Sequence, residues 1–356
     1  MSEPAVSRDD AAPIREGEQL DGEALNEFLR GKLDLPEKLS VAQFPHGHSN
    51  LTYLLRSGER EYVLRRGPLG PVAAKAHDMA REYRVLRAAH PHFPEAPEAH
   101  LLCENPAVIG APFFIMERRH GTILRDRVPK SISAFHDYPA IISKAVAGGL
   151  VRLHAVDVNN PELSSLGKPD GFVERQVHGW AERWHRAQTQ DLQKVESVIE
   201  WLAASLPPSQ PATLVHNDYK LDNVMLSPES PAKIEAVLDW EMATIGDPLV
   251  DVGLTLCYWH WIATPQLGSS TLPTLTSGKG WYTREEFLEQ YVRETGRDLS
   301  HIQFYEVLGL FKLAVILQQI FYRFHRGQTS DQRFRHFDQR VKALADLALS
   351  LVESAR

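Results

Sequence analysis

The spacing of hydrophobic residues changes along this chain of 356 residues, and this change constrains the fold most strongly. Between Val41 and Arg66, hydrophobic residues recur at about every second position, in the stretches VAQF, LTYLL and EYVLRR. The segments that join these stretches, PHGHSN and SGER, have the composition of turns. This pattern is typical of short antiparallel strands connected by hairpins. We therefore expect an antiparallel sheet near the N-terminus.

Helical spacing follows the predicted strands. The stretch DMAREYRVLRAA begins with Asp78 as the expected N-cap, and it places Met79, Tyr83 and Leu86 on one helical face. Two more strand candidates, HLLCE and APFFIMER, come next, and Gly121 marks a break after them. Beyond this break, helical patterns predominate, over residues 134–156, 171–188, 192–205, 249–262, 284–295, 302–325 and 334–353. The pattern predicts an α+β protein with a small N-lobe, built from an antiparallel sheet plus a helix, and a larger, mainly helical C-lobe.

The domain organisation follows from the same pattern. We expect a flexible polar lead-in over 1–30, an N-lobe over 31–117 and a C-lobe over 118–356. The net charge of −7 is spread along the chain, so nucleic acid is not an expected partner. No uninterrupted apolar run reaches the roughly 18–20 residues of a membrane span, so no membrane partner is expected either. The sequence makes no prediction of the oligomeric state.

The two cysteines, Cys103 and Cys257, lie far apart in apolar surroundings. Two distant cysteines do not suggest a disulfide framework or a zinc site, and a reducing cytoplasm is the default expectation for such a chain.

A polar stretch, LVHNDYKLDNVML at residues 214–226, is bracketed by aliphatic residues. Asp218 lies five residues before Asn223, and Asp239 lies sixteen residues further on, at the end of the strand-like AVLDW. Phosphoryl transfer requires a carboxylate to receive the proton of the acceptor and oxygen ligands for Mg²⁺, and this spacing supplies three such groups. The competing interpretation is a plain polar turn, because Asp and Asn side chains bond readily to their own backbone. The surrounding motifs favour chemistry.

Those motifs resemble the aminoglycoside phosphotransferase and choline kinase-like superfamily. The resemblance is carried by GHSNLTYLL, EYVLRR, FFIMER, LVHNDYKLDNVML and VLDWEMATIGDPLVDVG, which cover roughly residues 40–255 in the same order. The corresponding protein-kinase segments are H-R-D-x-x-x-x-N and D-F-G. The pattern is closest to the branch that includes kinase-like domains fused to some acyl-CoA dehydrogenases. It implies a protein kinase-like bilobal fold and an ATP- and Mg²⁺-dependent phosphotransferase.

The resemblance also implies roles for residues of the polar stretch. Asp218 is the catalytic base, or the group that orients the acceptor hydroxyl, and Lys220 assists at the transferring phosphoryl group. Asn223 and Asp239 are the magnesium ligands. His216 is expected to buttress the loop rather than to react.

Other residues near this stretch have competing structural roles. The resemblance implies that Asp251 anchors the catalytic loop from the start of a helix, and helix capping is an equal alternative. Capping is the better interpretation for Asp247, and a turn role is the better one for Asp222. We expect His154 to be structural.

In the N-lobe, the resemblance implies that the turn after the first strand covers the nucleotide phosphates. The residues expected there are Gly47, Ser49 and Asn50. This turn has one glycine where protein kinases have three, so alone it would indicate only a hairpin. Met116 and Glu117 lie at the expected hinge and are candidates for the adenine pocket, with a plain strand end as the alternative.

A basic residue on the third strand is expected to pair with Glu82 and to bind phosphate. Protein kinases have lysine at this position, whereas this chain has arginine, whose planar guanidinium group can contact two oxygens at once. The alternation of side chains along a strand favours Arg65 over Arg66, because Arg65 lies on the same face as Val63. A surface ion pair is the alternative for Glu82 with Arg65.

The acceptor is expected to be a small molecule with a hydroxyl group. No A-P-E element follows LDW, which disfavours a protein kinase. Residues 322–342 contain six Lys or Arg residues and two Asp residues, which suits an anionic acceptor such as a hydroxy acid or a hydroxyacyl-CoA, although a solvated helix face is the plainer interpretation. An aminoglycoside or choline kinase and a nucleotide-binding pseudokinase are the alternatives. Five tryptophans are candidates for the acceptor pocket or for the core: Trp180, Trp184, Trp259, Trp261 and Trp281.

Overall fold

A computed structural model describes residues 11–45, 50–68, 78–261 and 275–354 of the chain. The chain forms two compact units. The N-terminal unit comprises residues 1–123, 225–227 and 235–243, and the C-terminal unit comprises the remaining residues up to 356. The first crossing between units therefore comes after residue 123, close to the expected boundary at residue 117 and the break at Gly121. The chain returns twice to the N-terminal unit, which hydrophobic spacing could not reveal.

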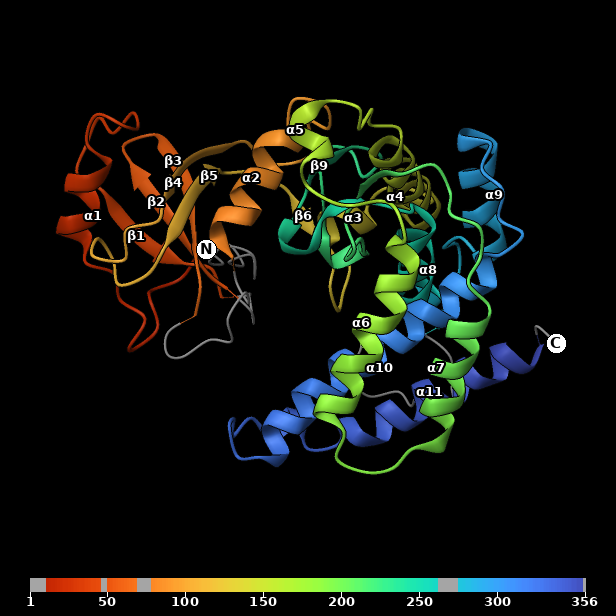
Figure 1. The fold of residues 1–356 in the computed structure, drawn as a ribbon. Helices are drawn as coiled ribbons and strands as arrows, with labels where there is room; N and C mark the ends of the chain where they lie inside the picture. The colour runs from red at the N-terminus through yellow and green to blue at the C-terminus, as the bar shows by residue number, and fades with distance from the viewer. Residues whose placement is uncertain (1–10, 46–49, 69–77, 262–274, 355–356) are drawn as a thin grey trace. The chain divides into compact units, whose positions relative to one another are not determined.

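The N-terminal unit contains a five-stranded antiparallel sheet with the strand order β1-β2-β3-β5-β4 (Figure 1). The strands are β1 (Ser40–Gln43), β2 (Leu51–Ser57), β3 (Arg60–Arg66), β4 (Ala99–Cys103) and β5 (Phe113–Glu117). These positions confirm the strands predicted from the period-two pattern. In β3, which pairs with β2 on one side and β5 on the other, Val63 and Leu64 are buried.

Two helices pack against this sheet. Helix α2 (Met79–Ala89) lies against β4 and β5, and the side chain of Asp78 caps it by accepting a hydrogen bond from the backbone N–H of Arg81 at 2.9 Å. Helix α1 (Gly22–Leu29) was not predicted, and it shows that these residues of the expected lead-in over 1–30 are helical. Leu25 and Leu29 of α1 are completely buried in the core of the sheet, because they lie four residues apart on one helical face.

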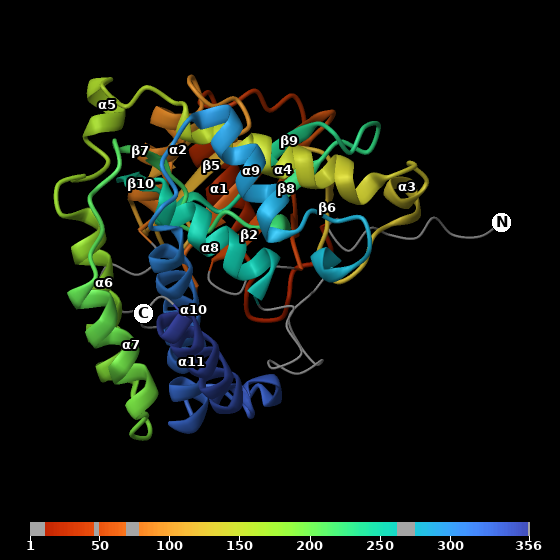
Figure 2. The ribbon, with the colours of Figure 1, turned by 90° about the vertical axis from the view of Figure 1, so that its right-hand side faces the viewer.

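The C-terminal unit is mainly helical (Figures 1 and 2). Its longer helices are α4 (Tyr138–His154), α6 (Phe172–Ala187), α7 (Gln193–Ala204), α8 (Leu249–Trp259), α9 (Arg284–Thr295), α10 (Ile302–His325) and α11 (Phe337–Ser354). Two short helices, α3 (Lys130–Ser133) and α5 (Pro161–Ser164), complete the set among the described residues. Helix α6 runs beside α7, and α10 packs against α6, α8 and α11.

Helix α10 is the central helix of the C-terminal unit. Its length and composition would allow it to cross a membrane, which qualifies the expectation that no segment reaches that length. However, 78% of its most apolar 18-residue stretch is buried inside the protein, as in the core helix of a globular domain. Three of its buried positions are polar or charged, Glu306, Lys312 and Gln318.

Short strands frame the polar stretch. Strand β7 (Thr213–Val215) enters it and pairs with β10 (Thr244–Gly246), and a 3₁₀ turn over Leu221–Asn223 leads into β8 (Val224–Leu226). Strand β8 forms a small sheet with β6 (Thr122–Ile123) and β9 (Ile234–Val237). The aliphatic residues on both sides of the polar stretch are buried, as the sequence predicted.

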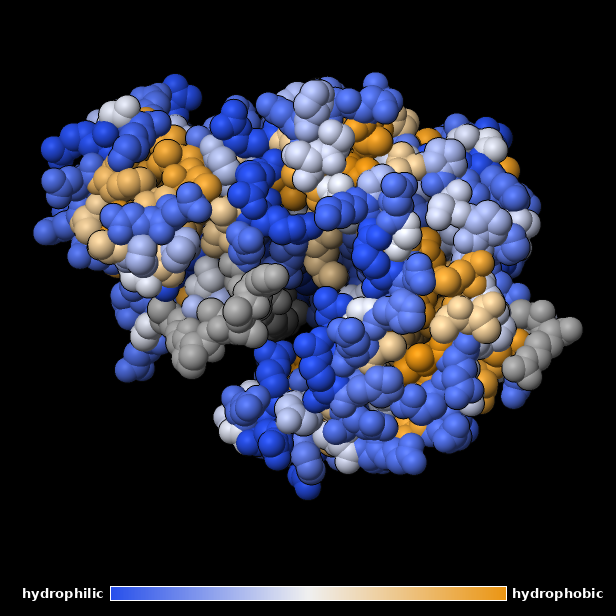
Figure 3. Space-filling view, in the orientation of Figure 1, coloured by the Kyte–Doolittle hydropathy of each residue, from blue (hydrophilic) through white to orange (hydrophobic). Residues whose placement is uncertain are grey.

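The hydrophobic side chains are mostly interior. On the face shown in Figure 3, hydrophilic residues surround the hydrophobic patches that reach the surface. Among the described residues, the large hydrophobic side chains classed as exposed are Leu206 and Val292, each 38% exposed.

Candidate active site

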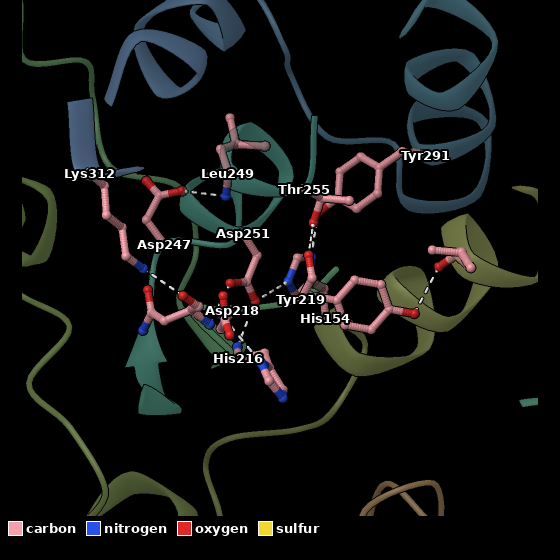
Figure 4. Close-up of polar contacts among 12 residues, drawn as sticks. His154, His216, Asp218, Tyr219, Asp247, Leu249, Asp251, Thr255, Tyr291 and Lys312 are labelled. Carbon is pink, nitrogen blue, oxygen red and sulfur yellow. Dashed lines mark hydrogen bonds and ion pairs between the residues drawn. The ribbon is translucent and has the colours of Figure 1, made fainter. Parts of the chain in front are cut away.

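The polar stretch forms a loop whose backbone is held by a buried carboxylate of α8. Asp251 accepts hydrogen bonds from the backbone N–H groups of His216 and Asn217, both at 2.6 Å (Figure 4). Asn217 has a φ of 62°, in the left-handed region that asparagine tolerates better than most residues. The backbone N–H of Asp218 in turn donates to Nδ1 of His216 at 3.3 Å. The backbone of the loop is therefore held in place by these hydrogen bonds.

Asp251 is itself part of a buried network. His154 Nε2 lies 3.3 Å from its Oδ2, and the hydroxyl of Tyr291 lies 2.8 Å from His154 Nδ1. Burial alone would raise the pKa of Asp251, but the hydrogen bonds from His154 and from the loop outweigh it and lower the pKa. Burial lowers the pKa of His154, which favours the neutral imidazole. Asp251 is thus a loop anchor rather than a simple helix cap, and His154 supports it.

The capping role belongs to Asp247. Its carboxylate accepts hydrogen bonds from the backbone N–H groups of Leu249 at 2.9 Å and Gln210 at 3.0 Å, and from the hydroxyl of Tyr305 at 2.8 Å. This agrees with the interpretation preferred from the sequence.

The Asp218 carboxylate has one oxygen held and one oxygen open. Its Oδ2 accepts a hydrogen bond from the amide nitrogen of Asn223 at 2.9 Å and lies 3.0 Å from Nζ of Lys220. Among the described residues, no hydrogen bond reaches its Oδ1. The side chain is 19% exposed. A carboxylate held in this way can accept a proton through its second oxygen while its orientation stays fixed.

Lys220 places a positive charge next to Asp218. Burial alone would lower the pKa of Lys220, but Tyr258, Asp218 and Asp222 together raise it well above the ordinary value. Its ammonium group also lies 5.0 Å from the centre of the Tyr258 ring. Burial raises the pKa of Asp222, which lies in the turn itself. The turn role preferred for Asp222 thus agrees with its place in the loop.

The side chain of Asn223 suits a cation ligand. Its amide nitrogen donates to both the backbone oxygen and Oδ2 of Asp218, each at 2.9 Å. The amide oxygen is therefore the atom left for a cation, and Mg²⁺ prefers oxygen ligands. Asp239 offers a carboxylate that is 35% exposed, on a residue with a left-handed φ of 69°. A non-glycine residue in this conformation costs free energy, and such residues are often found at functional sites. The donor types at both positions fit Mg²⁺.

Arg65 lies between two carboxylates of the N-terminal unit. Its Nε is 3.3 Å from Glu82 and its Nη2 is 3.0 Å from Asp239. Arg66 points elsewhere and donates to the backbone oxygen of Ile109 at 2.7 Å. The expected pair of Glu82 with Arg65 is thus present and buried, as strand alternation indicated, and the surface alternative is wrong.

The surroundings of this pair favour the charged form of Arg65 and disfavour the charged form of Glu82. Burial would lower the pKa of Arg65, but the carboxylates of Glu82, Asp239 and Glu241 outweigh it and raise the pKa. Burial raises the pKa of Glu82 to about 7, and Arg65 only partly offsets this. Glu241 also accepts a hydrogen bond from the side chain of Asn50 at 3.0 Å, which connects the turn before β2 to the segment after Asp239.

The structure does not test the roles predicted for the remaining binding residues. Gly47 and Ser49 lie outside the described residues, so their phosphate-binding role stays a prediction. Met116 is buried at the end of β5, and Glu117 pairs with Arg119 at 2.8 Å. The adenine-pocket role of Met116 and Glu117 also stays a prediction.

The tryptophans lie mostly in the core. Those that are buried are Trp180, Trp184, Trp259 and Trp281. Trp261 is half-buried, and its indole nitrogen donates to Glu306 at 2.9 Å. The core interpretation therefore fits four of the five tryptophans.

The basic residues of 322–342 make local contacts. Arg333 pairs with Asp331 at 2.6 Å, and Lys342 lies 3.9 Å from Asp338. Arg340 lies 4.8 Å from the centre of the Phe337 ring. These contacts agree with the plainer interpretation of residues 322–342 as a solvated helix face.

The comparisons with known proteins agree with this geometry. A family model described as the phosphotransferase enzyme family matches residues 40–305. The chain belongs to this family. Among curated proteins, this phosphotransferase is 34% identical over 340 residues to acyl-CoA dehydrogenase family member 10 of Mus musculus, a match that covers 94% of the chain and 31% of that protein. It is 30% identical over 360 residues to family member 11 of Homo sapiens, which covers 99% of the chain and 45% of that protein.

The chain therefore spans between about a third and a half of the length of these relatives. The resemblance to the branch fused to acyl-CoA dehydrogenases, predicted from the motifs, is confirmed.

Solved structures show the same fold. A structure from Ralstonia eutropha, assigned as an aminoglycoside phosphotransferase, has a TM-score of 0.79 and 30% identity, and the match covers 94% of this chain and 99% of that one. An aminoglycoside phosphotransferase in a ternary complex with AMP-PNP and hygromycin B has a TM-score of 0.59 at 19% identity, covering 92% of this chain and 98% of that one. The kinase-like α+β fold expected from the sequence is confirmed.

Three site residues were not predicted. Glu241 follows Asp239 by two positions, and the acidic pair in LDWE was the signal that could have indicated it. Tyr258 and Lys312 lie in helices far from the polar stretch in sequence. A lysine flanked by apolar residues in LGLFKLAVIL was the one available signal for Lys312.

Proposed function

We propose that this protein transfers the γ-phosphoryl group of ATP, with Mg²⁺, to a hydroxyl group of a small molecule. The observation that carries the proposal is the Asp218 carboxylate, whose Oδ2 is held by Asn223 and Lys220 while Oδ1 stays open. This arrangement suits a group that receives a proton from an acceptor hydroxyl. Retention of both Asn223 and Asp239 alongside Asp218 speaks against a pseudokinase.

The reaction assigns one task to each residue. The acceptor hydroxyl donates a hydrogen bond to Oδ1 of Asp218, and its proton passes to that carboxylate as the oxygen forms a bond to the γ-phosphorus. The bond between the γ-phosphorus and the bridging oxygen breaks, and ADP leaves. The ammonium group of Lys220, held in its charged form, stabilises negative charge on the transferring group. Bound Mg²⁺ would neutralise charge on the phosphates, and Asn223 and Asp239 would hold it.

For the acceptor, we propose an anionic hydroxylated compound, such as a hydroxy acid or a hydroxyacyl-CoA. Three cations support this proposal. Lys220 lies at Asp218, and Arg183 and Lys312 both contact the ring of Trp180, with their cationic groups 4.6 Å and 5.4 Å from its centre. Lys220 and Arg183 are both among the charges that act on Lys312, so these three cations lie near one another. Asp218 also acts on Lys312. Cations in the surroundings of Asp218 attract an anionic acceptor and repel a polycationic aminoglycoside.

The names of the curated relatives add a second line of support. Both contain acyl-CoA dehydrogenase in their names, and an acyl-CoA with a hydroxyl group carries the phosphates that cations recognise. Localisation in the cytoplasm is part of the proposal and rests on the cysteine usage of the sequence.

The test measures ADP release from ATP and Mg²⁺ with a panel of 3- and 4-hydroxyacyl-CoAs, simple hydroxy acids, choline and aminoglycosides. We expect release above the water background with at least one anionic acceptor, together with a phosphorylated product detected by mass spectrometry. Turnover of an aminoglycoside or choline alone would overturn the acceptor class. Nucleotide binding without turnover of any acceptor would instead indicate a pseudokinase.

A further inference from the structure

A lysine is buried beneath the catalytic loop. Lys312 lies in α10, is only 3% exposed, and donates a hydrogen bond from Nζ to the backbone oxygen of Asn217 at 2.5 Å (Figure 4). In the proposal above Lys312 contributes only positive charge to the surroundings of Asp218, and none of the reaction steps uses it.

The contact fixes the peptide group that leads into the catalytic residue. The carbonyl of Asn217 belongs to the peptide bond that it shares with Asp218. The N–H of Asn217 is held by the Asp251 carboxylate, at 2.6 Å. Asn217 is therefore held on both sides by opposite charges while it keeps a left-handed conformation. The carbonyl could not rotate without losing the charged hydrogen bond from Lys312.

Packing alone does not explain a lysine at this position. A buried ammonium group loses hydration, and a hydrophobic residue of similar volume would fill the space in a core helix without this cost. The ring of Trp180 and the carbonyl of Asn217 compensate only part of the loss. Burial lowers the pKa of Lys312 to about 8, so the residue remains mainly charged at neutral pH. A costly charge that contacts the catalytic loop points to a role in that loop.

We propose that Lys312 is a positioning residue for phosphoryl transfer, whose ammonium group fixes the carbonyl of Asn217 and thereby orients the carboxylate of Asp218. This inference rests on the proposed function of Asp218. Lys312 acts through the backbone and does not contact the reacting atoms.

The charge of Lys312 makes a pH dependence part of the inference. The charged and titratable groups that act on it or respond to it come from the catalytic loop, α6 and α8: Asp218, Lys220, Arg183, Asp251 and Cys257. The hydrogen bond to Asn217 weakens when Lys312 loses its proton. We expect kcat of the wild-type protein to fall as the pH rises through about 8. Because arginine does not titrate in this range, Lys312→Arg should retain its activity to higher pH.

The central test compares Lys312→Met with Gln318→Met. Gln318 is a matched control, because it lies on the same helix, is completely buried, and donates to the backbone oxygen of Ala187 at 2.8 Å, away from the catalytic loop. In the ADP-release assay, we expect Lys312→Met to lower kcat by about 10- to 100-fold, as for the loss of a charged hydrogen bond, with little change in the KM for ATP. Gln318→Met should keep kcat within about twofold, whatever its effect on thermal stability.

Hydrogen exchange measured by mass spectrometry provides a readout that needs no acceptor. Peptides that cover 213–224 should exchange faster in Lys312→Met than in the wild type or in Gln318→Met. An unchanged kcat in a folded Lys312→Met protein, or an alkaline fall in kcat that Lys312→Arg does not move, would overturn the inference while the proposed function stands. If the wild type turns over no acceptor, the proposed function fails. Hydrogen exchange then decides whether Lys312 anchors the loop, and equal exchange in the variants would overturn that as well.

Discussion

The amide nitrogen of Asn223 lies 2.9 Å from Oδ2 of Asp218. This contact joins the proposed metal ligand and the proposed catalytic base in one hydrogen-bonded unit. It sets the orientation of both side chains, because it directs the amide oxygen of Asn223 away from Asp218 and leaves Oδ1 of Asp218 open. A change at Asn223 should therefore affect both the metal requirement and the chemical step.

Asn223→Ala tests this coupling. Removal of the amide takes away one oxygen ligand, and we expect the Mg²⁺ concentration that gives half-maximal activity to rise by at least about tenfold. A Mg²⁺ titration of ADP release at saturating ATP measures this. Asn159→Ala is the matched control, because Asn159 also donates its amide to an Asp carboxylate, that of Asp157 at 2.8 Å, but in an exposed turn. An unchanged Mg²⁺ dependence in Asn223→Ala would contradict the ligand assignment.

Asp251→Asn should impair both stability and catalysis. The carboxylate holds two backbone N–H groups of the catalytic loop, and loss of a buried, hydrogen-bonded charge costs about 3–5 kcal/mol in the free energy of unfolding. Asp247→Asn removes a carboxylate that is equally buried and hydrogen-bonded but that holds no atom of the loop. We expect both variants to lose stability in denaturant unfolding and only Asp251→Asn to lose kcat per folded molecule. Equal kcat losses would mean that Asp251 is no more than a structural residue.

Arg65→Lys should weaken nucleotide binding. A lysine offers one point charge and cannot reach Glu82 and Asp239 in the way that the planar guanidinium group does. Loss of one charged hydrogen bond, about 1.5–3 kcal/mol, corresponds to a rise of roughly tenfold or more in the KM for ATP. Arg60→Lys, which alters an exposed pair with Asp34, should leave this KM unchanged. If both variants bind ATP like the wild type, the phosphate-binding role of Arg65 is wrong.

The pKa of Lys312 predicts a pH dependence of stability. The folded-state pKa, about 8, lies below the ordinary value of 10.5, so the unfolded chain binds the proton more tightly between these two pH values. The free energy of unfolding of the wild type should therefore rise relative to that of Lys312→Met as the pH increases from 8 to 10, by roughly 2–3 kcal/mol. Urea unfolding of both proteins across this range measures the difference. A difference that stays constant with pH would show that folding does not lower the pKa of Lys312.

Much of the fold could be predicted, because the hydrophobic period reports local structure directly. The alternation in EYVLRR predicted both the strand β3 and the face of Arg65, and the polar N-cap at Asp78 predicted the start of α2. Helix α1 was missed because it has only eight residues and lies in a polar segment that was interpreted as a lead-in. Its two buried leucines, Leu25 and Leu29, pack in the core of the sheet, and this contact is not visible from local sequence.

The candidate site could be predicted only in part, for a related reason. Asp218, Asn223 and Asp239 lie close together in sequence, and their spacing carried the prediction. Lys312 and Asn217 lie 95 positions apart in the sequence, and the spacing of hydrophobic residues gives no information about a contact over such a separation. Asn50 and Glu241 lie 191 positions apart, and their hydrogen bond depends on the return of the chain to the N-terminal unit.

The central claim is that Asp218 activates the acceptor hydroxyl, and Asp218→Asn tests it most directly. The measurement is the rate of phosphorylated-product formation by wild type and variant at saturating ATP and Mg²⁺, after a thermal shift shows that both bind the nucleotide. Asp346→Asn, which changes an exposed carboxylate paired with Lys194, serves as the control. The account predicts that Asp218→Asn binds nucleotide but forms product about 10²- to 10⁴-fold more slowly. Product formation by Asp218→Asn at the wild-type rate would contradict it.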